Sequence, residues 1–261
     1  MSTFVAITRG VSPAMAQCEL THLERVPIDA MRAAEQHAGY ERALEKVGCH
    51  IERIVAAPDL PDCVFVEDAA VVLDEVAILM RSGAESRRGE VQAVARALLP
   101  HRPILSLEAP ATMDGGDVMV VDRAIFVGTS NRTNLPGIEQ LRQMVAPLGY
   151  ALHPVSVSGC LHLKSAVTAL DEATLLINPS WARADQFRGF AFIEVDDTEP
   201  TAANIVRVGP HLIYSAGFPR TLGKLQERGY EVTAVDVSEI AKAEGAVTCC
   251  SLIFRPLTPG D

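Results

Sequence analysis

Short apolar runs recur along the whole chain and alternate with longer segments whose apolar positions have a helical spacing. The runs are rich in Val, Ile and Phe, which is typical of buried or half-buried strands. They are FVAITR, CVFVEDAAVVL, VAILMR, DVMVVDRAIFVG, TLLINP, FAFIEV, NIVRVGPHLIYSAG, YEVTAVDV and CCSLIF. Between them the pattern predicts helices over residues 28–47, 85–99, 138–148 and 220–227. The first helix follows Pro27 and is expected to end at Gly48.

The strands tend to come in pairs before a helix follows. AAVVL and VAILM precede the helix at 85–99, and DVMVV and AIFVG precede the helix at 138–148. Short polar turns at 73–75 and 121–123 are typical of hairpins within these pairs. A unit of two strands and a helix, about 50 residues long and repeated about five times, indicates a propeller or a solenoid. A mixed α+β sheet is the alternative.

Composition and charge narrow the classes of function. The 261 residues are 48% hydrophobic and 21% charged, so a folded globular protein is expected and a largely disordered chain is excluded. With 23 Lys and Arg against 33 Asp and Glu, the net charge is −10. That balance argues against nucleic acid as a partner and suits a small cationic substrate.

The sequence also bears on location. It contains no run approaching the ~20 apolar residues that cross a bilayer, so no membrane partner is expected. Its first residues, MSTFVAITRG, lack a basic segment followed by an apolar one, which argues against a signal peptide. The six cysteines show no CxxC spacing and are too sparse for a disulfide scaffold. These features predict a cytoplasmic protein with reduced thiols.

Acidic residues border apolar segments at two places. Glu67 and Asp68 end the segment PDCVFVED, where they are either solvated at a strand end or form a pocket for a cation. A buried carboxylate needs a partner to offset its desolvation, and a cation supplies one. The DGGD motif beginning at Asp114 predicts a tight turn, because Gly-Gly permits backbone angles closed to other residues. Such a turn either only redirects the chain or aims Asp114 at a site.

Cysteine and histidine occur in two further motifs, LHLKS with His162 and TCCS with Cys249 and Cys250. Buried cysteines usually act as small apolar residues, and a histidine between leucines is usually packed and hydrogen-bonded. Brought together with Asp114, however, these residues could supply a thiol nucleophile, a general acid/base and a group that orients it. Cys160 and His162 could also ligate a metal, but no second pair has the spacing of a structural zinc site.

Two arginines lie in predicted turns. Arg81 precedes Ser82-Gly83, and Arg132 lies within TSNRTN. Arginines in turns are usually solvated. Two that converge would instead bind a carboxylate, which their planar donors suit.

Six motifs occur in an order that resembles one known family. They are PDCVFVEDAAVV, RSGAESRR, DGGDV, NRTN, LHLKS and TCCS. Their combination resembles the dimethylarginine dimethylaminohydrolases, members of the guanidino-group-modifying (pentein) superfamily, from Arg9 to about Phe254. The resemblance implies an α/β fold, a five-bladed α/β propeller of ββαβ modules around a central channel, with residues 1–261 as a single catalytic domain.

The resemblance also implies roles for individual residues. Cys249 would be the nucleophile, His162 the general acid/base and Asp114 the carboxylate that supports it. The substrate would be bound through its guanidinium by Glu67 and Asp68, through its α-carboxylate by Arg81 and Arg132, and through its α-amino group by Asp62 and the carbonyls of Leu20 and Ala243. No cofactor and no metal are implied. The loop CELTHLERVPID and Ala243 depart from the mammalian pattern, which bears on substrate preference more than on reaction type.

The implied reaction is hydrolysis of Nω-methylated L-arginine to L-citrulline and dimethylamine or methylamine, through a covalent S-alkylthiouronium on the cysteine. An arginine deiminase-like or citrulline-hydrolysing activity on the same scaffold is an alternative. Amidinotransferases are usually larger, and the joint presence of Cys249, His162 and Asp114 argues against a non-catalytic binding module. The expected partner is a small guanidino amino acid. Because relatives include monomers and dimers, a homodimer is also open.

Overall fold

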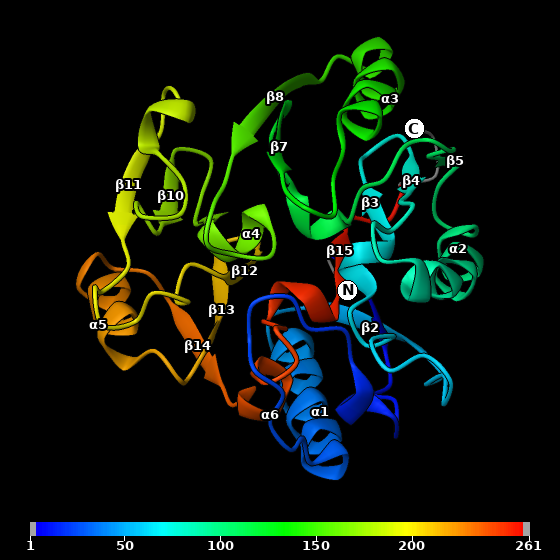
Figure 1. Cartoon of the computed structure of the whole chain (residues 1–261). Coiled ribbons are helices and arrows are strands. Elements are labelled where there is room, and N and C mark those ends of the chain that lie inside the picture. The colour runs from blue at the N-terminus through cyan, green and yellow to red at the C-terminus, as the bar shows by residue number, and fades with distance from the viewer. Residues whose placement is uncertain (1–3, 258–261) are drawn as a thin grey trace.

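Fifteen strands form five three-stranded sheets in the computed structural model, which describes residues 4–257. The strands are β1 (Phe4–Arg9), β2 (Cys49–Ile54), β3 (Ala70–Val72), β4 (Ala77–Leu79), β5 (Ile104–Ser106), β6 (Val118–Val121), β7 (Ala124–Thr129), β8 (Ala151–Ser156), β9 (Val167–Ala169), β10 (Thr174–Ile177), β11 (Ala191–Glu194), β12 (Ile205–Val208), β13 (His211–Ser215), β14 (Val232–Val235) and β15 (Leu252–Phe254). The sheets are arranged as blades around a common centre (Figure 1).

All five blades have the same strand order. In each, the middle strand pairs antiparallel with a first strand and parallel with a third, as in β3-β4-β5 and β6-β7-β8. The exception in connectivity is the blade β15-β1-β2, whose first strand comes from the far end of the sequence. There β15 pairs antiparallel with β1, with Val5 opposite Phe254 and Ile7 opposite Leu252. Both ends of the described chain therefore share one blade, which closes the ring.

Helices link the parallel strands, which need a crossover connection. They are α1 (Ala30–Lys46), α2 (Val91–Leu98), α3 (Leu135–Val145) and α5 (Pro219–Glu227). Two of these helices begin at a capping residue, Asp29 for α1 and Asn134 for α3. The side chain of each accepts hydrogen bonds from backbone N–H groups in the first turn. Between β10 and β11 only a 3₁₀ turn, Ala184–Gln186, occurs. The predicted strand pairs and four helices are confirmed, although residues 85–90 form a 3₁₀ helix ahead of α2.

One strand prediction is wrong over most of its length. The run CVFVEDAAVVL is extended only at β3, whereas η2 (Val66–Ala69) before it is a 3₁₀ turn. Likewise CCSLIF begins with η7 (Thr248–Cys250) and becomes a strand only at β15. Both apolar runs lie at the interior of the ring, where a short segment is buried whether extended or turned. Hydrophobicity therefore marked burial there, not backbone conformation.

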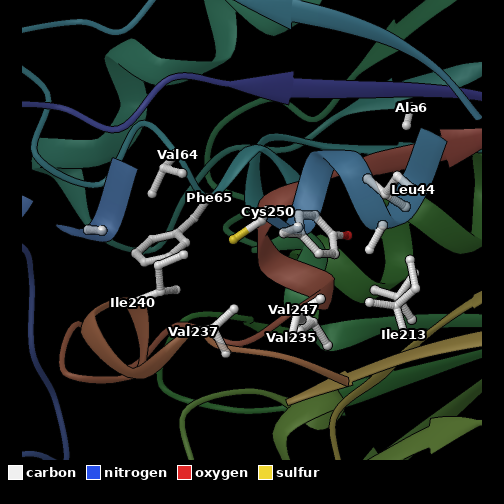
Figure 2. Packing of buried hydrophobic residues seen from close by; sticks show 14 of the residues in the cluster. Ala6, Leu44, Val64, Phe65, Ile213, Val235, Val237, Ile240, Val247 and Cys250 are labelled. Atoms are coloured by element: carbon white, nitrogen blue, oxygen red, sulfur yellow. The ribbon is translucent and has the colours of Figure 1, made fainter. Parts of the chain in front are cut away.

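An apolar cluster fixes these two turns against each other. Phe65, which directly precedes η2, and Cys250 of η7 lie in the same core, beside Leu44 of α1 and Ile240 of α6 (Ser238–Ala241), as Figure 2 shows. Gly245 allows the close approach, because a Cβ added there would lie 2.3 Å from the Phe65 ring. Within residues 4–257, no helix is long and apolar enough to cross a membrane.

Candidate active site

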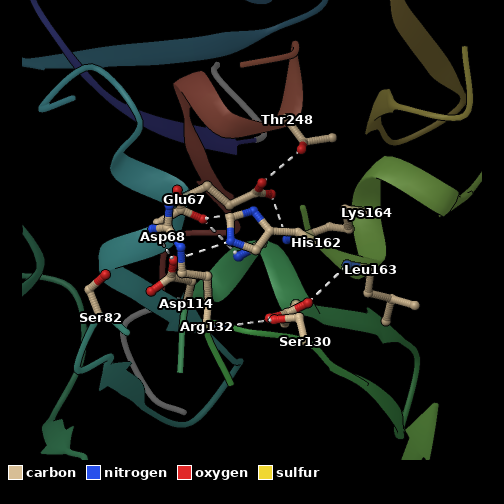
Figure 3. A network of polar contacts seen from close by, with 12 residues as sticks. Glu67, Asp68, Ser82, Asp114, Ser130, Arg132, His162, Leu163, Lys164 and Thr248 are labelled. Carbon is tan, nitrogen blue, oxygen red and sulfur yellow. Dashed lines mark hydrogen bonds and ion pairs between the residues drawn. The ribbon is translucent and has the colours of Figure 1, made fainter. Parts of the chain in front are cut away.

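The polar residues at the centre of the ring come from equivalent places in the five blades. Each lies in the short segment that precedes the blade's first strand: η2 before β3, η4 (Gly115–Asp117) before β6, α4 (Leu163–Ala166) before β9, residues 203–204 before β12 and η7 before β15. Figure 3 shows side chains from four of these segments converging. The blade architecture thus places Glu67, Asp68, Asp114, His162 and Cys249, distant in sequence, in one region.

His162 lies between two carboxylates. Its Nε2 is 3.2 Å from Oδ2 of Asp114, and its Nδ1 is 3.8 Å from Oδ1 of Asp68 (Figure 3). Burial alone would lower the pKa of His162, but the charge of Asp68 and the hydrogen bond to Asp114 raise it to about 9. The imidazole is therefore protonated at neutral pH and is ready to act as an acid.

Asp114 is fully buried and is held from three sides. Its carboxylate accepts hydrogen bonds from the backbone N–H of Gly83 at 3.1 Å and from Arg132 Nη1 at 3.3 Å, besides the contact with His162. Burial would raise its pKa, but the hydrogen bond and the charge of His162 hold the pKa below its ordinary value. Asp114 therefore stays ionised and fixes the ring of His162.

The two glycines of DGGD are needed for this close packing. A Cβ added at Gly115 would lie 2.0 Å from the carbonyl oxygen of Glu67, and one at Gly116 would lie 2.6 Å from Nδ1 of His162. The backbone N–H of Gly116 donates to Oδ1 of Asp68 at 3.0 Å. The sequence predicted a tight turn and left open whether it aims Asp114 at a site. The structure adds that the glycines leave room for the imidazole and for Asp68.

Glu67 connects the turn η2 to two other segments. Lys164 Nζ lies 2.6 Å from Oε1 of Glu67, and Thr248 Oγ1 donates to Oε2 at 2.7 Å. Asn204 completes this network, since its Nδ2 donates to the Lys164 carbonyl at 2.9 Å and to Oγ1 of Thr248 at 2.9 Å. Its Oδ1 accepts the N–H of Thr248 at 3.1 Å. The turn that carries Cys249 is thereby fixed to α4 and to η2.

The two adjacent cysteines have different environments. Cys249 is partly exposed, whereas Cys250 is fully buried in the apolar core. Burial and the charges of Glu67 and Asp68 raise the pKa of Cys249 to about 12. The thiol is therefore neutral in the free protein. A cation placed beside those carboxylates would favour its ionised, nucleophilic form.

Comparison with known proteins bears on this arrangement. A family model described as N,N dimethylarginine dimethylhydrolase, eukaryotic, matches residues 21–178. The N(G),N(G)-dimethylarginine dimethylaminohydrolase of Streptomyces coelicolor is 40% identical over 97% of both chains. The chain belongs to the dimethylarginine dimethylaminohydrolase family. A relative of the same name from Pseudomonas aeruginosa is 37% identical over 87% of this chain and 90% of its own.

Solved structures of the dimethylarginine dimethylaminohydrolase family share the fold. The P. aeruginosa enzyme, as a cysteine-to-serine variant complexed with citrulline, matches with a TM-score of 0.92 at 34% identity, covering 96% of this chain and 98% of that one. A histidine-to-glycine variant of a dimethylarginine dimethylaminohydrolase, in an adduct with S-methyl-L-thiocitrulline, has a TM-score of 0.91 with 96% and 99% covered. These matches confirm the predicted family and its propeller fold.

Of the two arginines singled out in the sequence, only Arg132 joins the polar network. It is mostly buried and contacts Asp114 and, through Nη2, the hydroxyl of Thr21 at 3.2 Å. Arg81 instead donates from Nη1 to the carbonyl of Ala111 at 3.0 Å. The buried arginine near Asp68 is Arg87, whose Nη1 lies 2.8 Å from Oδ2 of that carboxylate.

The contribution of Asp117, the second aspartate of DGGD, was not predicted from the sequence. Its fully buried carboxylate accepts hydrogen bonds from Ser130 Oγ at 2.5 Å, Thr133 Oγ1 at 2.6 Å and the N–H of Leu163 at 2.9 Å. It therefore joins the loop of Arg132 to the start of the helix that follows His162. Gly128 makes room for it, because a Cβ there would lie 2.7 Å from Oδ1 of Asp117.

The three residues predicted to bind an α-amino group lie near one another through a loop over residues 18–25. Asp62 is buried and accepts the N–H of Glu19 at 3.0 Å, while burial raises its pKa. Leu20 follows in this loop and is partly buried. Ala243 is buried, and the residue after it, Glu244, is hydrogen-bonded to the same loop. Beside this segment is a cavity of about 430 Å³, whose lining includes Leu23, Leu161, Trp181, Phe218 and Val247.

Three groups of the network could in principle ligate a metal. Ligand atoms of Asp68, Asp114 and His162 all lie within 4.8 Å of one another. The two carboxylates, however, already have cationic partners in Arg87 and Arg132. The donor set is thus largely neutralised by protein cations, and the sequence prediction of no metal and no cofactor stays a prediction.

Proposed function

We propose that this protein hydrolyses Nω-methylated L-arginine, that is asymmetric dimethylarginine and monomethylarginine, to L-citrulline with release of dimethylamine or methylamine. The observation that carries this proposal is the placement of His162 between Asp68 and Asp114, on segments that converge with the turn of Cys249. Relatives at 37–40% identity bear the name dimethylarginine dimethylaminohydrolase, which supports the same substrate class.

The first step exploits the positive charge of the substrate. Glu67 and Asp68 bind the guanidinium, keep it protonated and hold its carbon against the sulfur of Cys249. The bound cation counters the carboxylate charges that hold the thiol neutral, so the thiol loses its proton to solvent and the thiolate forms next to its target. Attack on the guanidino carbon then makes a carbon–sulfur bond and gives a tetrahedral adduct.

His162 acts in both halves of the reaction. It donates its proton to the methylated nitrogen as the carbon–nitrogen bond breaks, because an amide anion cannot leave. The remaining S-alkylthiouronium is attacked by a water whose proton passes to His162. The carbon–sulfur bond then breaks as the remaining hydroxyl proton of the adduct passes to the departing sulfur, so citrulline leaves and the thiol and the imidazolium are restored. Asp114 keeps the ring oriented throughout.

A product assay tests this proposal. Purified protein is incubated separately with asymmetric dimethylarginine, monomethylarginine, arginine and citrulline, and citrulline and the released amines are quantified. We expect citrulline and dimethylamine from the first substrate and little product from arginine. Comparable release of ammonia from arginine would instead identify a deiminase, and ammonia from citrulline a ureido hydrolase. Absence of turnover with all four compounds would refute the proposal.

Arg132 is proposed to bind the α-carboxylate of the substrate. Replacing it by alanine should raise KM for asymmetric dimethylarginine by about tenfold, because carboxylate binding is shared by the ground state and the transition state. The fall in kcat should be smaller, since Asp114 keeps its bonds to Gly83 and His162. Steady-state kinetics measure both parameters, and an unchanged KM would remove Arg132 from the substrate site.

The matched variant Arg81→Ala tests the other arginine predicted from the sequence. A similar rise in KM would support that prediction, despite the bond of Arg81 to the Ala111 carbonyl.

The ligand itself is a small molecule in this proposal. The homodimer, the cytoplasmic location and the single catalytic domain stay predictions, and analytical ultracentrifugation of the purified protein tests the first.

A further inference from the structure

One carboxylate holds three consecutive backbone amides of the loop beside the site. Glu244 accepts hydrogen bonds from the N–H groups of Thr21 at 3.0 Å, His22 at 2.5 Å and Leu23 at 2.6 Å. In the described chain, these amides are the hydrogen-bond partners of the Glu244 side chain. Segments separated by more than 200 residues in the sequence are joined at this point.

The backbone of Glu244 is itself unusual. Its φ is 57°, in the left-handed region that residues other than glycine rarely adopt. The next residue, Gly245, is packed against Phe65, where a Cβ would clash at 2.3 Å. The conformation of the turn that carries Glu244 is therefore fixed by the core beneath it. The positive φ costs free energy, and it occurs at the residue whose side chain binds the loop.

The neighbours of this junction are the groups predicted to receive the substrate's α-amino group. Thr21 follows Leu20, and Glu244 follows Ala243. The same loop is bound to Asp62 through the N–H of Glu19 at 3.0 Å. An α-ammonium group has three N–H donors, and two carbonyl oxygens with one carboxylate would match them in number. Thr21 also contacts Arg132, the proposed partner of the α-carboxylate.

We propose that Glu244 is a positioning residue that sets specificity for a free α-amino acid. Its carboxylate holds residues 21–23 so that the carbonyls of Leu20 and Ala243 converge, with Asp62, on the α-ammonium group. Glu244 does not touch the reacting atoms and acts through the loop. This inference rests on the proposed function, because it assigns the loop to recognition of that substrate's amino-acid end.

The first test does not depend on turnover. Hydrogen–deuterium exchange of residues 19–25 is compared in the wild type, Glu244→Gln and Glu244→Ala. We expect exchange of the amides of 21–23 to accelerate at least about tenfold in the alanine variant, and less in the glutamine variant, which retains one acceptor oxygen. Unchanged exchange in both variants would show that Glu244 does not hold residues 21–23 and would overturn the proposal.

Kinetics then test the specificity. For Glu244→Ala, KM for asymmetric dimethylarginine should rise about tenfold with kcat within about twofold, as expected for loss of binding shared by ground and transition states. The second compound is the analogue of asymmetric dimethylarginine that lacks the α-amino group, and its KM should not change. An equal rise for both compounds, or none for either, would overturn the proposal, because a merely loosened structure would affect the two alike.

Glu199→Gln is the matched control. Glu199 also accepts two backbone N–H groups from another segment, Arg220 at 2.9 Å and Thr221 at 2.8 Å, but it lies in the connection between β11 and β12. It should leave exchange at 21–23 and both KM values unchanged. A wild type without turnover would refute the proposed function, and the exchange measurement would still decide whether Glu244 holds the loop.

Discussion

Replacing Cys249 by serine should lower kcat/KM for asymmetric dimethylarginine by at least about a thousandfold, while the protein stays folded and still binds citrulline. A serine hydroxyl is a far weaker acid and nucleophile than a thiol, and the nearby Glu67 and Asp68 oppose any further negative charge. The change removes one sulfur atom from a partly exposed position, so its structural cost is small. Steady-state assays, a thermal melt and citrulline titration measure the three quantities.

Cys250→Ala is the control for this prediction. It removes the neighbouring thiol from the same turn, but that thiol packs in the apolar core and donates to the carbonyl of Ala246 at 3.6 Å. We expect some loss of stability and near-normal turnover. If the serine variant at 249 retained more than a few per cent of wild-type activity, Cys249 would not be the nucleophile, and a large loss for the Cys250 variant alone would move the role to that residue.

The order of strands and helices could be predicted from the sequence because it depends on short-range patterns of residues. Hairpin turns at 73–75 and 121–123, and helices with clear ends such as Ala30–Lys46, depend on neighbouring residues. What failed was the backbone of PDCVFVED. Glu67 and Asp68 were predicted on a strand, where they would face opposite sides, but the 3₁₀ turn there lets both reach the network.

The supporting residues of the site were harder to find. Lys164, Thr248 and Asn204 are single polar residues beside apolar neighbours in the sequence, and only the assembled ring brings them to Glu67 and to one another. A signal did exist, because each lies in the short segment that precedes a blade's first strand. The repeat units share too little identity for that equivalence to be aligned from a single chain.

The arginines illustrate the same limit. RSGAESRR contains three of them, and sequence alone favoured Arg81 because it precedes a turn. The structure buries Arg87 against Asp68 and Glu90 and places Arg88 beside Glu85. Which guanidinium faces inward depends on how the 3₁₀ helix 85–90 joins α2. A pattern of hydrophobic positions does not determine that junction.

Replacing His162 by glycine should separate the two halves of the reaction. S-methyl-L-thiocitrulline has methanethiol as its leaving group, and a thiolate leaves without the proton that an amine requires. We therefore expect the variant to release about one equivalent of methanethiol per active site and then stop, because water is not activated to hydrolyse the intermediate. Asymmetric dimethylarginine should give no detectable dimethylamine.

A thiol-release time course and intact-protein mass spectrometry measure this outcome, the adduct adding the mass of the substrate less methanethiol. The wild type should instead turn over repeatedly, and the double variant with Cys249→Ser should release nothing. A related histidine-to-glycine enzyme is known as an adduct with this compound, which supports the feasibility of trapping. Repeated turnover of either substrate by the single variant would show that the protonated imidazole, held between Asp68 and Asp114, is not the acid and base of the reaction.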